Sequence, residues 1–189
     1  MAEHAQGLGN PAVVGLAGFG MTTLMLQIHN LGWCEIGPII ALGFIFGGLA
    51  QLIAGYKEFQ VNNNFGFSAF CSYGAFWIAL ALIFLFNRYG VFVTPERSLG
   101  WFLGCWGLYT LIMLYPAMRV SGAMGFTFLT LFLGFLGLTI GHFGFHVFNI
   151  IAAVILIVCA LSAFYMMASA IYAQVFGRVI LPLGKPWVK

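Results

Sequence analysis

The chain carries very little charge. Charged residues make up 6% of its 189 residues, whereas a soluble domain carries about 25%. Residues 120–177 contain no Lys, Arg, Asp or Glu. The formal net charge of +3 is scattered rather than gathered into the basic patch that nucleic-acid binding requires. We therefore expect neither a nucleic-acid partner nor a soluble domain.

Residue types suited to metal or redox chemistry are also scarce. The cysteines form no C-x-x-C motif and stand singly, at Cys34, Cys71, Cys105 and Cys159. His142 and His146 have a spacing that can hold a metal, but no carboxylate or third ligand lies nearby. We interpret them, and His29, as histidines near the membrane interface. With no nucleophile–base pair in the apolar segments, we predict no metal, no cofactor and no enzyme activity.

Long apolar runs dominate what is present. The chain is 62% hydrophobic, with a mean hydropathy of +1.04, which is typical of a polytopic membrane protein surrounded by lipid. A spanning helix needs about 20 apolar residues. The sequence predicts an all-α membrane protein, a single six-helix domain over residues 1–189, with approximate spans 11–28, 37–56, 65–87, 99–118, 123–141 and 147–176. Short connections should make sequential helices antiparallel neighbours.

Basic residues between the spans indicate orientation, because cytoplasmic loops are enriched in Lys and Arg. Arg88 and Arg97 would lie on one side of the membrane. The other side would hold more of them: Lys57, Arg119, Arg178, Lys185 and Lys189. We therefore expect a multi-pass protein of the plasma membrane with both termini in the cytoplasm.

The first span is built for the interior of a bundle. Asn10 is suited to cap it, and Pro11 suits the first helical position. The segment after them is rich in Gly and Ala and contains the pair Thr22 and Thr23. Small residues let helices approach closely in lipid, and hydroxyl groups there need partners. The third span likewise begins at Asn64 and runs into small and hydroxyl-bearing residues.

Three spans that start on the same side carry a bulky residue at equal depth. Phe19 follows Asn10 by nine residues, Tyr73 follows Asn64 by nine, and Leu131 follows Gly122 by nine. Nine residues of helix rise about 13.5 Å, close to the middle of a hydrocarbon core of about 30 Å. The spacing predicts a narrow apolar constriction formed by Phe19, Tyr73 and Leu131.

Polar side chains without charge would line the rest of a pathway. No Lys or Arg lies within a span, so an anion would meet only weak, serial contacts. Helix N-termini favour anions, and we expect Asn10 and Asn64 to cap two of them at the cytoplasmic mouth. The other candidates are hydroxyls and one amide, each of which could instead bond to its own helix: Thr22, Thr23, Gln51, Ser68, Ser72, Thr127, Thr130 and Ser162. Such a pathway suits a small monocarboxylate or its neutral acid.

Several motifs resemble one known family. Residues 10–16, N-P-A-V-V-G-L, and 18–23, G-F-G-M-T-T, are similar to the N-P-A-P-L-G-L signature of the acetate uptake transporter family, which includes bacterial succinate–acetate permeases and yeast acetate permeases. Further matches are G-G-L-A-Q at 47–51, N-F-G at 64–66 and F-G-R-V-I-L-P at 176–182. Val13 and Val14 depart from the signature. The segment 171–174 lacks an acidic residue of the bacterial permease, which puts proton coupling through that position in doubt.

The resemblance implies a homohexamer with one pore per protomer that passes acetate and sometimes succinate. It also implies a Phe–Tyr–Leu constriction at Phe19, Tyr73 and Leu131, and a residue that tunes substrate size at Ala163. Glycine pairs spaced by four are typical of close helix contact in lipid, either within a protomer or between protomers. They are Gly43 with Gly47, Gly100 with Gly104, and Gly137 with Gly141.

Two alternatives remain beside acetate passage. The first is transport of ammonium or another small weak electrolyte. The absence of a carboxylate within the predicted spans argues against transport of a cation. The second is a membrane scaffold without a pore, which the hydroxyl-rich first and third spans argue against. The residues leave open whether acetate would pass through a channel or by proton-linked transport.

Overall fold

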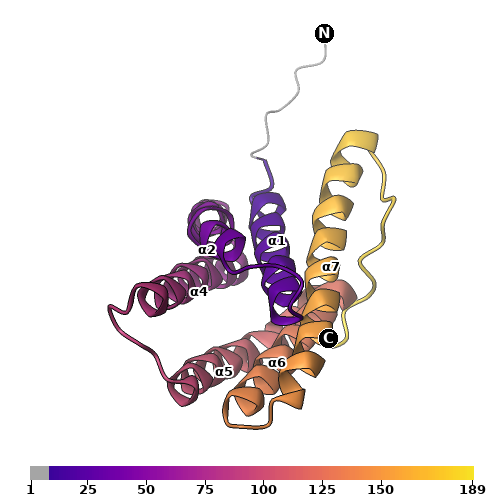
Figure 1. The fold of residues 1–189 in the computed structure, drawn as a ribbon. Helices are drawn as coiled ribbons and strands as arrows, with labels where there is room; N and C mark the ends of the chain where they lie inside the picture. The colour runs from indigo at the N-terminus through magenta and orange to yellow at the C-terminus, as the bar shows by residue number, and fades with distance from the viewer. Residues whose placement is uncertain (1–8) are drawn as a thin grey trace.

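The computed structural model describes residues 9–189, and the described chain is helical (Figure 1). Six helical segments are long and apolar enough to cross a membrane, as predicted. The second crossing runs to Gln60 rather than to residue 56, and a π-helix interrupts it. The elements are α1 (Ala12–Asn30), α2 (Gly37–Phe44), η1 (Ile45–Ala50), α3 (Gln51–Gln60), α4 (Asn64–Tyr89), α5 (Glu96–Val120), α6 (Gly122–His142) and α7 (Val147–Phe176).

The helices form two groups, α1–α4 and α5–α7, which meet where α1 packs along α7 (Figure 1). Within the groups α3 packs on α4, and α6 packs on both α5 and α7. The expectation that all sequential helices are close neighbours is wrong for α4 and α5, whose backbones do not pack closely. Aromatic side chains bridge them instead; the ring of Phe76 stacks on that of Phe102 with centroids 5.8 Å apart.

Glycine allows α1 and η1 to cross in close contact. A Cβ atom at Gly18 would overlap the backbone carbonyl of Phe46. One at Gly47 would overlap the side chain of Thr22. A π-helical stretch inside an α-helix is rare and often marks a functional region, and here it places the start of α3 against α1.

The spaced glycine pairs pack inside the protomer, which answers the question that the sequence left open. Gly43 lies against Ala81 of α4, and Gly100 lies against His142 of α6. Gly137 lies against Ala152 of α7. Neighbouring helices of the same chain therefore occupy the space beside these glycines.

The outward faces of α5 and α7 carry large apolar side chains that are exposed in the single chain. Such faces suit lipid or a neighbouring protomer, because both are apolar. Examples are Leu108, Ile112 and Tyr115 on α5 and Ile150, Val154 and Leu161 on α7.

After α7 the chain turns back and runs alongside it (Figure 1). We call residues 181–187 the C-terminal strap. The hydroxyl of Ser169 on α7 donates to the carbonyl of Leu181 at 2.6 Å. The N–H of Ala123 donates to the carbonyl of Leu183 at 2.8 Å, and the N–H of Trp187 donates to the carbonyl of Met118 at 2.9 Å. The strap thereby pairs backbone groups at the junction of α5 and α6.

Candidate functional site

Three cavities follow one another through the bundle. We call the end where α1 begins and α7 ends the terminal face, and the end that holds the α6–α7 connection the hairpin face. The terminal cavity, about 130 Å³, lies among the first turns of α1, α4 and α6 and the end of α3. The central cavity is about 30 Å³. The hairpin cavity, about 190 Å³, lies among the end of α1, the end of α6 and the start of α7.

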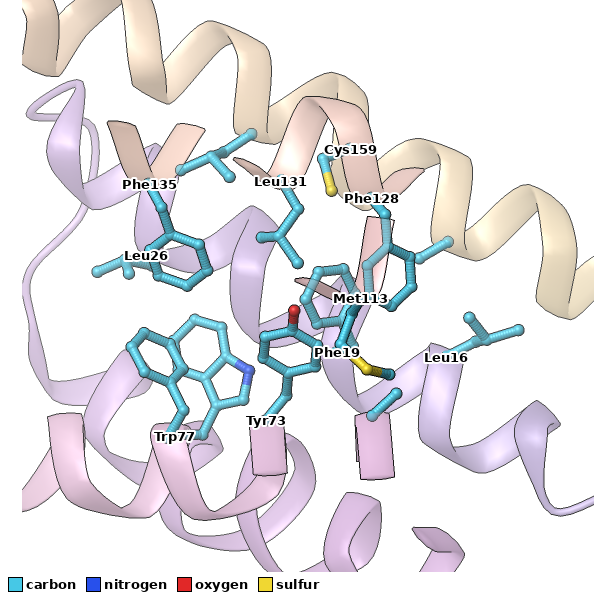
Figure 2. Packing of buried hydrophobic residues seen from close by; sticks show 14 of the residues in the cluster. Leu16, Phe19, Leu26, Tyr73, Trp77, Met113, Phe128, Leu131, Phe135 and Cys159 are labelled. Carbon is cyan, nitrogen blue, oxygen red and sulfur yellow. The ribbon is translucent and has the colours of Figure 1, made fainter. Parts of the chain in front are cut away.

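Phe19, Tyr73 and Leu131 separate the terminal cavity from the central cavity, because all three line both. Their exposed fractions are 7%, 3% and 4%. The ring centroids of Phe19 and Tyr73 are 6.0 Å apart, and Figure 2 shows the three side chains turned toward one another. The residues predicted to share one depth are therefore brought together by α1, α4 and α6, and we call them the aromatic constriction.

Hydrogen bonds hold the Tyr73 ring in place. Its hydroxyl lies 2.8 Å from Oγ1 of Thr110, which itself donates to the carbonyl of Trp106 at 2.7 Å. A hydroxyl has one proton to donate, so Tyr73 must be the donor to Thr110. The ring of Tyr109 packs edge-on against Tyr73 at 5.6 Å. Tyr73 thus presents its ring, rather than its O–H proton, to the constriction.

A buried carboxyl group lines the terminal cavity. Glu58 is only 2% exposed, which corrects the expectation that no carboxylate would be buried. Its Oε2 accepts a hydrogen bond from Nδ2 of Asn63 at 2.7 Å. Its Oε1 is buried without a partner in hydrogen-bonding geometry among the described residues, although the backbone N–H of Ala12 lies close enough to act on the carboxyl group. A signal existed in the sequence: Glu58 follows Gln51 by seven residues and lies on the same helix face.

The predicted capping residues differ from the observed ones. Pro11, predicted as the first helical residue, is instead the N-cap of α1, which begins at Ala12. Asn10 precedes the cap, and its Oδ1 accepts from the N–H of Ala12 at 3.0 Å. The expectation that Asn64 caps α4 is wrong, because Asn63 is the capping residue and accepts from the N–H of Gly66 at 3.1 Å. Asn64 is instead the exposed first residue of the helix. Asn63 therefore performs two tasks, since its amide nitrogen also holds Glu58.

Three of the predicted polar residues are buried near the pathway. Gln51 lines the terminal cavity, and neither end of its amide has a partner among the described residues. Thr23 lines the central cavity, and its hydroxyl has no partner in the described part of the chain. The hydroxyl of Thr22 is likewise buried with no partner there, but it lies against Gly47, between α1 and η1.

The remaining candidates, apart from Thr127, lie off the three cavities. Ser68 bonds to the hydroxyl of Tyr109 at 2.8 Å. Thr130 donates to the carbonyl of Phe126 in its own helix at 2.8 Å, and Ser162 bonds to Thr127 at 2.6 Å on the outer side of α6 and α7. Ser72 and Ala163 line none of the three cavities. Thr127 does line the terminal cavity.

The hairpin cavity contains polar residues that the sequence did not mark as a site. They are His29, Asn30, His142 and Asn149. Three leucines line both this cavity and the central cavity, namely Leu26, Leu103 and Leu138. We call these three the leucine ring. The interfacial interpretation of His29 and His142 is thus incomplete, because helices far apart in sequence bring both into one cavity.

The cavities suit a small uncharged or weakly held solute. No Lys or Arg is among the described residues that line them, and the described chain contains no cluster of metal-binding side chains. A solute that moved from one face to the other would pass amide and carboxyl groups, the aromatic constriction, and then the leucine ring. The central cavity holds two or three waters at most, since one water needs about 10–15 Å³ measured this way.

Known proteins share both the sequence and the fold. Residues 1–182 match the sequence model described as the GPR1/FUN34/yaaH family. The chain is 39% identical over 181 residues to the Succinate-acetate/proton symporter SatP of Escherichia coli (strain K12), spanning 94% of this chain and 96% of that protein. It is 39% identical over 152 residues to Acetate permease A of Emericella nidulans, spanning 74% of this chain and 51% of that protein. The solved structure of the bacterial acetate channel SatP has a TM-score of 0.91 at 39% identity, and covers 94% of this chain and 100% of that one.

Proposed function

The chain belongs to the GPR1/FUN34/yaaH family, and we propose from this membership and its aligned cavities that it passes acetate and similar small monocarboxylates across a membrane. The relatives are named as a symporter, a permease and a channel rather than as enzymes. The observation that carries the proposal in this chain is the aromatic constriction, which lies between the terminal and central cavities.

The size of the central cavity supports a small substrate. A space of about 30 Å³ suits a two-carbon carboxylate, whereas succinate, with two carboxyl groups, requires the constriction to widen. Phe19, Tyr73 and Leu131 set this limit. Gln51 and Thr23 offer the substrate polar contacts on either side of the constriction, since both are buried with unpartnered polar atoms.

Glu58 supplies a group for proton-linked passage. An unpaired buried carboxylate oxygen is stabilised by a proton or by a cation, and Glu58 Oε1 is such an atom. Asn63 keeps the other oxygen oriented. Proton-linked transport in this chain therefore does not need the acidic residue that segment 171–174 lacks. The same carboxyl removes the sequence argument against ammonium, so the test below includes that ion.

The terminal face lies in the cytoplasm of a plasma-membrane protein in this proposal. Most basic residues of the chain belong to that face, with only Arg88 and Arg97 near the hairpin face, and cytoplasmic loops are enriched in Lys and Arg. The protein forms a homohexamer with one pore per protomer. The exposed apolar faces of α5 and α7 supply surface for that assembly.

The test is flux through the purified protein in lipid vesicles. Initial entry of radiolabelled acetate, at a pH where little neutral acid crosses the lipid, is compared with entry into protein-free vesicles of the same composition. We expect a protein-dependent flux that saturates with acetate. Entry of ammonium without acetate would favour the weak-electrolyte alternative, and entry of neither would favour a scaffold.

A further inference from the structure

The orientation of the His29 ring is fixed at the edge of the hairpin cavity. Its Nδ1 lies 2.7 Å from the backbone carbonyl oxygen of Cys34. A carbonyl oxygen only accepts hydrogen bonds, so Nδ1 carries a hydrogen. Nε2 then carries a lone pair in the neutral ring and a hydrogen that it can donate in the charged ring. No hydrogen bond among the described residues occupies Nε2, so this nitrogen is free to exchange a proton with a solute.

A second polar group faces the same cavity from α7. The Oδ1 atom of Asn149 is buried without a partner among the described residues. It lies so close to Gly141 that any Cβ there would overlap it. Glycine at this position therefore makes room for an amide, and Asn149 offers its N–H₂ group to a carboxylate oxygen.

The cavity offers no permanent positive charge. Among the described residues that line it, His29 and His142 alone can titrate, while α4 and α5 contribute only apolar side chains to it. Glu96 on α5 and His146 before α7 are close enough to act electrostatically on His142. A carboxylate that enters can be neutralised only by a protonated imidazole. Beyond it lies the leucine ring, which an ionised carboxylate crosses at far greater cost than a neutral acid.

We propose that the hairpin cavity binds one monocarboxylate and that His29 donates a proton to it before it crosses the leucine ring. This inference rests on the proposed function. Protonated His29 pairs with one carboxylate oxygen through Nε2–H, while Asn149 donates to the other. The Nε2–H bond breaks as the O–H bond of the acid forms, and the N–H electron pair stays on Nε2. Neutral His29 keeps its bond to Cys34 and takes its next proton from water at the hairpin face.

The position of His29 favours this role over His142. His29 lies in the last turn of α1, and the carbonyl of Cys34 fixes the orientation of its ring. It also follows Leu26 of the leucine ring by three residues, on the same helix face. No hydrogen bond holds the ring of His142 among the described residues, so that ring lacks a fixed donor geometry.

The first experiment compares acetate flux in His29→Gln with flux in the parent, over outside pH values of roughly 5 to 8, the range in which imidazole changes charge. We expect His29→Gln to lower the flux about tenfold or more and to flatten its pH profile. His146→Gln is the matched control, because that residue is exposed and does not line the cavity. An unchanged profile in His29→Gln, or the same loss in His142→Gln alone, would overturn the inference.

The second experiment needs no change to His29. Nitrogen NMR of ring-labelled histidines is recorded for the parent in detergent, with acetate or chloride added at equal ionic strength. The chain has four histidines, so variants of the other three assign the His29 signal by elimination. We expect acetate, and not chloride, to shift the His29 Nε2 signal toward the imidazolium form. A parent that transports acetate while this signal stays unmoved refutes the inference but not the proposed function, whereas a parent without acetate flux refutes the proposed function itself.

Discussion

Tyr73 donates its hydroxyl hydrogen to Thr110 at 2.8 Å, and so a residue of α5 fixes a ring of α4. The backbones of these two helices do not pack closely. The bond therefore fixes the Tyr73 ring at the constriction and adds one of several side-chain contacts between α4 and α5. The variants that follow test each part of this arrangement.

Thr110→Val should weaken the fold and loosen the constriction. The change leaves the Tyr73 hydroxyl buried without an acceptor, which costs about 1–3 kcal/mol. Thr139→Val is a matched control, because Thr139 bonds only to its own helix. We expect the first variant to unfold in detergent at a clearly lower temperature than the second. Equal unfolding temperatures would mean that the Tyr73–Thr110 bond does not hold the ring.

Leu131→Ala should widen the path. Removing the side chain from the aromatic constriction leaves space for a second carboxyl group, so succinate entry should rise relative to acetate entry. Leu136→Ala serves as the control, since Leu136 lies on the same helix with 44% of its surface exposed. The buried change also costs about 2–5 kcal/mol of stability, so vesicles are matched for folded protein. An unchanged ratio of succinate to acetate would show that Leu131 does not limit substrate size.

Glu58→Gln should separate proton movement from substrate movement. The variant keeps an oxygen for the Asn63 hydrogen bond but cannot bind a proton. We expect acetate flux to lose its dependence on an imposed proton gradient, as measured with a pH-sensitive dye inside the vesicles. Glu35→Gln, at an exposed loop residue, should behave as the parent does. Retention of gradient dependence in Glu58→Gln would exclude this carboxyl as the coupling group.

Asn63→Ala and Asn64→Ala should differ although the residues are adjacent. Loss of the Asn63 cap should cost about 1 kcal/mol and should also release Glu58. Asn64 accepts no capping bond, so its replacement should leave stability nearly unchanged. Chemical unfolding monitored by tryptophan fluorescence measures both. Equal effects would contradict the assignment of Asn63 as the cap.

Gly47→Ala should impair folding, whereas Gly37→Ala should not. A Cβ at Gly47 would overlap Thr22, but one at Gly37 would meet nothing within 4 Å. We expect a smaller folded yield for Gly47→Ala, with the folded fraction retaining the oligomeric mass of the parent. A folded monomer in native mass spectrometry would instead place this glycine in contacts between protomers.

The sequence predicted those features that depend on hydropathy and helical rise. Charge-free runs located the six crossings. Nine residues separate Tyr73 and Leu131 from the observed starts of α4 and α6, but Phe19 lies seven residues after the observed start of α1 at Ala12, so the argument from equal spacing holds for two of the three helices. Features that depend on tertiary contacts were not accessible. The predicted second span ended before the charged residues Lys57 and Glu58, whereas α3 continues to Gln60, so Glu58 fell outside the predicted span although the structure buries it.

The hairpin cavity also could not be predicted from the sequence, because residues of different helices meet there only in the folded protein. His29, His142 and Asn149 come from the ends of three different helices, and each alone resembles an interfacial residue. The choice between Asn63 and Asn64 as the cap also depends on the backbone at Gly66 rather than on residue type. Hydroxyls such as Thr130 proved to bond to their own helix, as is common for threonine in membrane helices.

The C-terminal strap imposes an order on biosynthesis. The backbone N–H of Ala123, in the first turn of α6, donates to the carbonyl of Leu183 in the strap. The carbonyl of Met118, near the end of α5, accepts from the N–H of Trp187 in the strap. Both partners leave the ribosome only after every crossing has been made. The junction between α5 and α6 therefore reaches its final hydrogen bonding as a closing step, after α7 has been synthesised.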